Sequence, residues 1–282
     1  MSRRRLNPLP HQRARGRLEL GFVATARGTV LADLYQSSPL RALFPTPEPD
    51  EAPIAAVVNI AGGLAGGDAL DIAVRLGAGA RATVSAATAE KVYRSLGPVA
   101  RIDTRLEAGA GAWLEWIPQE TILFDGARLE RRITVEIAAD ARLLMAEIFV
   151  FGRSAHGETL RSGLVRDAWR LRRGGALLWA DGLLLDGDPG AALAAPFGFA
   201  GAEALGTVLY AGEAAESHRD GLRDAVPQSA APGGVTVPRP GLLLGRWLGD
   251  AQAVRRAVAD AVIALRSRAL GLPPRLPRLW TN

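Results

Sequence analysis

The side chains of this sequence that could carry chemistry are carboxylates, because the usual nucleophiles and metal ligands are scarce. The 282-residue chain has no cysteine, which excludes disulfides, thiolate metal sites and thiol nucleophiles. Its three histidines, His11, His156 and His218, lie far apart, and none adjoins a nucleophile motif or a second histidine at metal-ligand spacing. The sequence therefore argues against a catalytic triad and against a tight transition-metal site.

Seven acids stand beside aromatic or apolar segments: Asp68, Glu90, Glu115, Glu120, Asp125, Glu147 and Glu158. We expect most of them to be solvated surface residues. Glu120 and Glu147 lie within strongly apolar segments, and Glu158 follows a Gly-Arg turn. A buried carboxylate needs a partner, such as Arg153 or Arg94, or it should bind a cation. A line of such acids could conduct a divalent ion while holding it only weakly.

A glycine-rich stretch, residues 58–68, contains two Gly-Gly pairs and ends in Asp68. It is not a phosphate-binding loop, because the Gly-Lys-Ser/Thr ending is missing. It is not a dinucleotide-binding turn either, because the segment that follows it alternates like a strand rather than a helix. We interpret it as the beginning of a β structure, where glycines let backbones pack closely. Asp68 is the residue there that we expect to meet a metal or an arginine.

The elements that must position these acids repeat weakly along the chain. Each unit is a strand, a turn of small residues and a second strand, with a period of about thirty residues. Such a unit cannot bury its apolar face alone and must stack on its neighbours. The first strands are expected at residues 70–76, 101–106 and 132–137, and the second strands at residues 81–84, 113–116 and 142–145. The repeat therefore predicts a stacked, β-solenoid-like arrangement of sheets.

The rest of the chain is also mostly β in its pattern. Residues 165–172 and 176–185 alternate around Gly174-Gly175, which predicts a hairpin. A helix is expected after Asp250 and before Gly271, since apolar residues keep helical spacing between them. Residues 85–95 should form an ordered loop or one helical turn, and residues 186–201 a loop. The fold class is thus mainly β with about two helices, one of them near the C-terminus.

Composition and charge place further limits on function. The formal net charge is +5, and Lys91 is the only lysine among 34 basic residues. We attribute the arginines to coding bias, since they are dispersed rather than gathered in a nucleic-acid footprint. No apolar run approaches the roughly 20 residues that span a bilayer. We expect a cytoplasmic protein with a mobile basic arm, residues 1–14, and a single β domain, residues 15–282.

Four motifs, in their order along the chain, resemble the UreD family of urease accessory proteins, also called UreH. They are the glycine stretch at 59–68, Ala-Glu-Lys-Val-Tyr-Arg-Ser at 89–95, Trp-Ile-Pro-Gln-Glu-Thr-Ile-Leu-Phe at 116–124, and Gly-Arg with Gly-Glu at 152–158. The hairpin at 170–187 and the tail at 272–280 fit the family as well. Residues 188–240 carry no part of the resemblance.

The resemblance implies a non-enzymatic maturation factor with a mainly β, helically stacked fold. Family members bind UreF, which recruits the GTPase UreG, and the assembly docks on the urease apoprotein to deliver nickel. The ion is thought to pass through an internal tunnel lined by carboxylates, with no cofactor permanently bound. Carried over by motif position, the candidate nickel contacts in this chain are Asp68, Glu90, Glu120, Glu147 and Glu158. Oxygen ligands suit transit, because they hold nickel less firmly than imidazole or thiolate does.

Two other classes of function stay open from the sequence. A carbohydrate-active β-solenoid enzyme could use Asp68 and Glu120 as paired carboxylates, which retaining hydrolysis would need about 5–5.5 Å apart. A nucleic-acid-binding protein could use the basic arm together with Arg166, Arg170 and Arg172, which share one strand face. Such binding would weaken steeply with salt.

Overall fold

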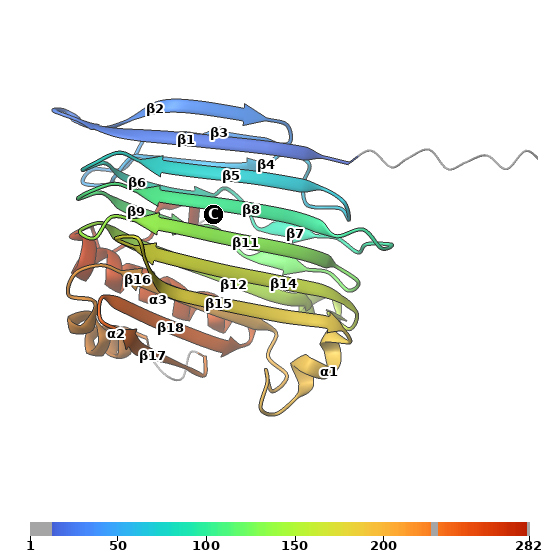
Figure 1. The fold of residues 1–282 in the computed structure, drawn as a ribbon. Helices are drawn as coiled ribbons and strands as arrows, with labels where there is room; N and C mark the ends of the chain where they lie inside the picture. Colours follow the sequence, from blue (N-terminus) through green and yellow to red (C-terminus); the bar gives the residue numbers. More distant parts are fainter. Residues whose placement is uncertain (1–12, 227–230, 281–282) are drawn as a thin grey trace, which may run out of the picture.

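The computed structural model describes residues 13–226 and 231–280, and it consists of two stacked β-sheets with helices against the outer face of one of them (Figure 1). The front sheet in that view has seven strands in the order β15-β14-β11-β8-β5-β1-β2, and we call it sheet A. Its strands are β1 (Arg15–Thr25), β2 (Gly28–Ser37), β5 (Ala69–Leu76), β8 (Ala100–Ala108), β11 (Arg128–Ile137), β14 (Gly163–Arg173) and β15 (Ala176–Gly187).

The second sheet, sheet B, lies behind sheet A and has the main order β17-β18-β16-β12-β9-β6-β4-β3. Three short strands, β7, β10 and β13, extend it from the side. Its strands are β3 (Leu40–Leu43), β4 (Ile54–Asn59), β6 (Arg81–Ala86), β7 (Glu90–Val92), β9 (Trp113–Ile117), β10 (Thr121–Leu123), β12 (Arg142–Arg153), β13 (Glu158–Thr159), β16 (Ala204–Ala211), β17 (Gly233–Arg239) and β18 (Leu242–Gly249).

The repeat seen in the sequence forms the middle of this stack. The strands β5, β8 and β11 pair in parallel in sheet A, and β6, β9 and β12 pair in parallel in sheet B. The chain thus passes from one sheet to the other and returns one level lower in each repeat. Short strands close a third side, where Lys91 pairs with Ile122 and Ile122 with Val150. The predicted β-solenoid-like architecture is confirmed, and residues one repeat apart become neighbours in space.

Two hydrophobic cores hold the layers together. The larger core lies between the sheets and includes Leu18 and Leu106 of sheet A and Leu114 and Leu143 of sheet B. Strands of sheet A contribute every second side chain to this core. In β8, for example, the residues from Ala100 to Ala108 alternate between buried positions and positions that are exposed or half-buried. The second core lies on the other face of sheet B and packs it against α3 (Ala251–Leu270). Central strands of sheet B are therefore buried on both faces.

The C-terminal helix begins and ends as its sequence predicts. The side chain of Asp250 accepts a hydrogen bond from the backbone of Ala253, and Gly271 ends the helix at a φ of +66°. Two further α-helices are present in the described part of the chain, α1 (Pro189–Ala194) and α2 (Arg219–Ala225), along with 3-10 turns at Ser154–His156, Ala215–His218 and Arg278–Trp280. The described residues thus contain three α-helices, one more than the two that we expected.

Two local predictions were wrong. The segment 186–201 contains α1 rather than a continuous loop, because Asp188 caps the backbone of Ala191 and Pro189 occupies the first helical turn. The segment 85–95 contains the end of β6 and the strand β7, whereas we expected an ordered loop or one helical turn. Its three residues pair with β10 in the next repeat, so a neighbour distant in sequence decides its conformation.

The proposed arm at residues 1–14 lies mostly outside the described residues. Of its described end, the backbone N–H of Ala14 donates to Oδ1 of Asp68 at 2.8 Å, and this contact places the start of β1 beside β5. The single-domain boundary at residue 15 stays a prediction.

Gly66 gives the first testable prediction, because its backbone lies against the loop before β8. A Cβ on Gly66 would meet the carbonyl oxygen of Pro98 at 2.6 Å and the side chain of Ser95. We expect Gly66→Ala to lower the free energy of unfolding by about 1–3 kcal/mol through this overlap. The control is Gly77→Ala, whose added Cβ would have its nearest neighbour at 3.5 Å. Equal urea midpoints for the two variants would contradict the prediction.

Candidate functional site

The interior between the sheets contains an ionic network at positions where alternation would place apolar side chains. Arg131 lies in β11 between the inward residues Leu129 and Ile133, and Asp167 lies in β14 between Val165 and Trp169. All of these side chains are buried. Charged groups in such positions need partners, because the desolvation of an unpaired charge is costly.

The partners are supplied by two sheets and four strands. Arg131 donates from Nε to Oδ1 of Asp167 at 2.7 Å and from Nη1 to Oε2 of Glu147 at 2.5 Å. Trp169 donates to the other oxygen of Asp167 at 2.8 Å, and Trp116 donates to the other oxygen of Glu147 at 2.8 Å. We call these five residues the Arg131 network. Each of its carboxylates is bound by one guanidinium nitrogen and one indole.

The electrostatics of the network follow from burial and pairing. Burial by itself lowers the pKa of Arg131, but the carboxylates of Asp167 and Glu147 outweigh this effect and raise it. Burial raises the pKa of Glu147, although Arg131 and the Trp116 indole favour its charged form. The Nη2 atom of Arg131 is buried and has no hydrogen-bond partner among the described residues. The guanidinium also lies 4.4 Å above the ring centre of Phe149.

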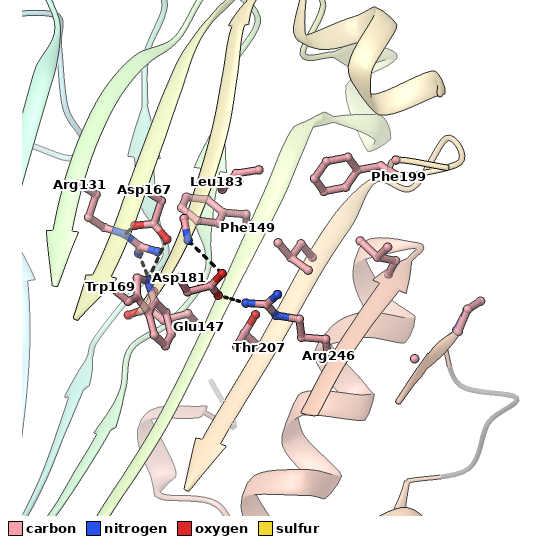
Figure 2. A pocket seen from close by; sticks show the side chains of 16 residues that line it. Arg131, Glu147, Phe149, Asp167, Trp169, Asp181, Leu183, Phe199, Thr207 and Arg246 are labelled. Carbon is pink, nitrogen blue, oxygen red and sulfur yellow. Dashed lines mark hydrogen bonds and ion pairs between the residues drawn. The ribbon is translucent and has the colours of Figure 1, made fainter. Parts of the chain in front are cut away.

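A cavity of about 430 Å³ lies on one side of the network and is shown in Figure 2. Its lining includes Arg131, Glu147 and Asp167 together with Asp181 of β15 and Arg246 of β18. Asp181 and Arg246 form an ion pair that bridges sheet A and sheet B. We call this space the Arg246 cavity.

A second cavity, of about 370 Å³, lies on the other side of the network. Its lining includes Glu90, Asn59 and Thr104, and we call it the Glu90 cavity. Asn59 donates to the Glu90 carboxylate at 3.1 Å and 3.3 Å. Burial raises the pKa of Glu90 to about 7, and the hydrogen bond from the neutral Asn59 offsets this only in part. Glu90 is therefore poised between its neutral and charged forms near neutral pH.

The two cavities share two lining residues, Arg131 and Glu147. The Arg131–Glu147 ion pair thus stands between two spaces inside the stack. Of the five acids proposed from the sequence, Glu147 lines both cavities and Glu90 lines one. The arrangement can offer carboxylate oxygens to a cation within the sheet stack, at positions about two repeats apart.

The other three proposed acids lie elsewhere and bind protein groups. Both oxygens of Asp68 accept backbone N–H groups at 2.8 Å, one from Ala14 and one from Ala65, so this carboxylate ties the glycine stretch to β1. Glu120 forms an ion pair with Arg255 of α3. Neither residue lines the Arg246 cavity or the Glu90 cavity.

Glu158 lies in β13, beside the end of β12. It pairs with Arg153, as the sequence suggested for a buried acid, and its Oε1 accepts the backbone N–H of Asp125 at 3.0 Å. The hydrogen bond from Arg153 lowers the pKa of Glu158, so this group stays charged at neutral pH. Its contacts join β13 to the loop after β10.

The sequence reasoning missed the partners of the interior acids. Arg131 and Asp167 share their alternation parity with buried apolar residues, and a strict count along each strand would have marked them as inward. Glu115 was expected to be solvated, yet it is fully buried and lies 3.1 Å from the fully buried Arg266 of α3. Burial raises the pKa of Glu115 to about 7, against the opposing effect of Arg266. Its signal was its place within the apolar run 113–117.

Residues 13–226 and 231–280 contain no group of three or more His, Cys, Asp or Glu residues placed to hold a metal ion together. In the same ranges, no helix is both long enough and apolar enough to cross a membrane.

Comparison with known proteins gives one consistent result. Residues 14–281 match the family described as UreD urease accessory protein. A urease accessory protein UreD of Granulibacter bethesdensis is 56% identical over 240 residues, covering 85% of this chain and 100% of the relative. Those of Methylobacterium sp. (strain 4-46) and Magnetococcus marinus are 46% and 44% identical, each covering at least 95% of both chains. The chain belongs to the UreD family of urease accessory proteins.

Proposed function

We propose that this chain is a nickel-delivery scaffold of urease maturation, and that nickel crosses it between the two sheets. Family membership supports the role in urease maturation. The observation that carries the route is the pair of interior cavities that share Arg131 and Glu147. The proposal includes UreF, UreG and the urease apoprotein as partners, a cytoplasmic location, no catalytic activity and no permanently bound cofactor.

The chemistry of the two cavities fits an ion in transit rather than an ion held in place. Glu90 and Glu147 provide hard oxygen donors, which bind nickel more weakly than imidazole or thiolate ligands do. They belong to different levels of the stack, and both line the Glu90 cavity, where Glu147 is part of the Arg131 network. An ion would pass from one carboxylate to the other, and each weak contact would allow its release. Asp68, Glu120 and Glu158 act in this proposal as structural acids.

The alternative of a carbohydrate-active enzyme has less support. Each oxygen of Asp68 accepts a backbone N–H group, and Glu120 is bound by Arg255 of α3. These contacts put the two acids in separate networks, and both are occupied. The nucleic-acid alternative relies on the outer face of β14, where Arg166 pairs with Glu130 at 3.1 Å and Arg172 donates to the carbonyl of Gly175. These contacts support a solvated strand face.

Co-purification tests the partner assignment. We expect the tagged chain, co-expressed with UreF and UreG, to retain both proteins on an affinity column and to bind the urease apoprotein in their presence. The control is the same expression without the tagged chain. Recovery of the folded chain alone, with UreF present in the same lysate, would contradict the proposal.

Blocking the Glu90 cavity tests the route. Thr104 of β8 is buried and lines this cavity, so Thr104→Trp should fill it with an indole. We expect nickel in urease to fall to the level found without the chain, while UreF is still retained. The matched control is Arg105→Trp, which places the same side chain on the exposed face of the same strand. Equal nickel contents for the two variants would reject passage through this cavity.

The raised pKa of Glu90 gives a test by stability. Below pH 4.5 the carboxyl is protonated in the folded and unfolded chains alike; as pH rises toward about 7, the unfolded chain ionises first. The wild type should therefore lose stability relative to Glu90→Gln between about pH 4.5 and 7, and the difference should level off above 7. Urea denaturation from pH 4 to 8 measures it. Parallel stability curves would show that Glu90 titrates normally.

A further inference from the structure

We propose that Arg131 is the gate of the passage between the sheets, an inference that rests on the proposed function. Its position is the first argument. Arg131 and Glu147 are the residues that line both the Arg246 cavity and the Glu90 cavity. An ion that moves from one cavity to the other must therefore pass the point where the guanidinium binds the carboxylate.

The positive charge of Arg131 opposes the passage of a free cation at its contact with Glu147. The guanidinium occupies one oxygen of Glu147 and one oxygen of Asp167, and the two indoles occupy the others. An arriving cation meets the positive guanidinium, and each oxygen of the two carboxylates already accepts one hydrogen bond. Because the side chain of Arg131 is only 6% exposed, water screens this repulsion poorly.

The same contacts define what could open the gate. If Arg131 moves aside, one oxygen each of Glu147 and Asp167 becomes free, and two negative charges face the passage. A divalent ion between them balances both charges, whereas Arg131 balances only one. The exchange therefore favours a divalent ion over sodium or potassium. In this exchange, either the guanidinium or the ion binds the two carboxylates at any time, so the carboxylates are never left buried without a partner.

The surroundings of Arg131 allow such a movement. Its Nη2 atom makes no hydrogen bond to any described residue, and one face of its guanidinium lies against the ring of Phe149. Open space lies on both sides, in cavities of about 430 Å³ and 370 Å³.

The experiment removes the charge and keeps the length of the side chain. Arg131→Met is compared with Arg132→Met, the same change one residue on, where the side chain is exposed. Each variant is co-expressed with UreF, UreG and urease, and the nickel and zinc contents of purified urease are measured over time. We expect Arg131→Met to load nickel faster at low nickel and to admit several-fold more zinc than the control.

Folding is controlled by thermal unfolding and by retention of UreF. If Arg131→Met does not accumulate as folded protein, Arg131→Lys decides, because lysine keeps the charge but lacks the fork that binds two carboxylates together. We expect it to change metal loading in the same direction by a smaller factor, relative to Arg132→Lys. If an Arg131 variant folds and gives urease the same nickel and zinc contents as its control does, Arg131 is not a gate.

Failure of the gate and failure of the route give different results. If Thr104→Trp stops nickel loading and the Arg131 variants match their controls, the passage stands and Arg131 is a structural residue of it. If Thr104→Trp loads nickel as Arg105→Trp does, the passage itself is rejected, and the gate is rejected with it.

Discussion

The parallel register of the repeats is the constraint on which the interior of this protein depends. It places residues one repeat apart side by side, so equivalent positions of successive repeats form a row that runs through the stack. Asn59 and Glu90 are 31 residues apart and bonded, as are Trp116 and Glu147. A side chain in such a stack therefore finds its partner in the coil above or below. The polar contacts between neighbouring coils are thus a property of the register, whereas the Arg131–Glu147 pair joins the two sheets within one coil.

Burial gives these contacts their chemical character. Sheet B is covered by sheet A on one face and by α3 on the other, so its inward acids are removed from water. Each acid is then governed by its partner. Glu158, near the surface and bound by Arg153, has a lowered pKa, whereas burial raises the pKa of Glu90, which is bonded to the neutral Asn59, to about 7. A fold that stacks acids at different depths thus contains carboxylates with different affinities for protons.

The sequence predicted the stack well and its interior poorly, for one physical reason. Strand periodicity, glycine turns and the capping of α3 are local, and all of them were predicted correctly. β7 was missed because its pairing partner in β10 lies one repeat away. Glu120 and Glu147 have equally apolar neighbours in sequence, yet Glu120 binds α3 and Glu147 binds Arg131 between the sheets. Apolar surroundings indicate burial, but the side of the sheet and the partner come from the packing of distant coils.

Asp68, at the end of the glycine stretch, is another acid whose partners could not be predicted from its neighbours in sequence. Asp68 follows four glycines and looked like a ligand, but the backbone N–H groups of Ala14 and Ala65 bind both of its oxygens. Glu90 and Glu147 differ from it because their partners are side chains that can be exchanged. In the proposed passage, Glu90 would exchange a proton for a cation near neutral pH, and Glu147 would exchange a guanidinium for one. The two steps respond to different conditions, the first to pH and the second to the movement of Arg131, so a passage containing both can be filled and opened independently.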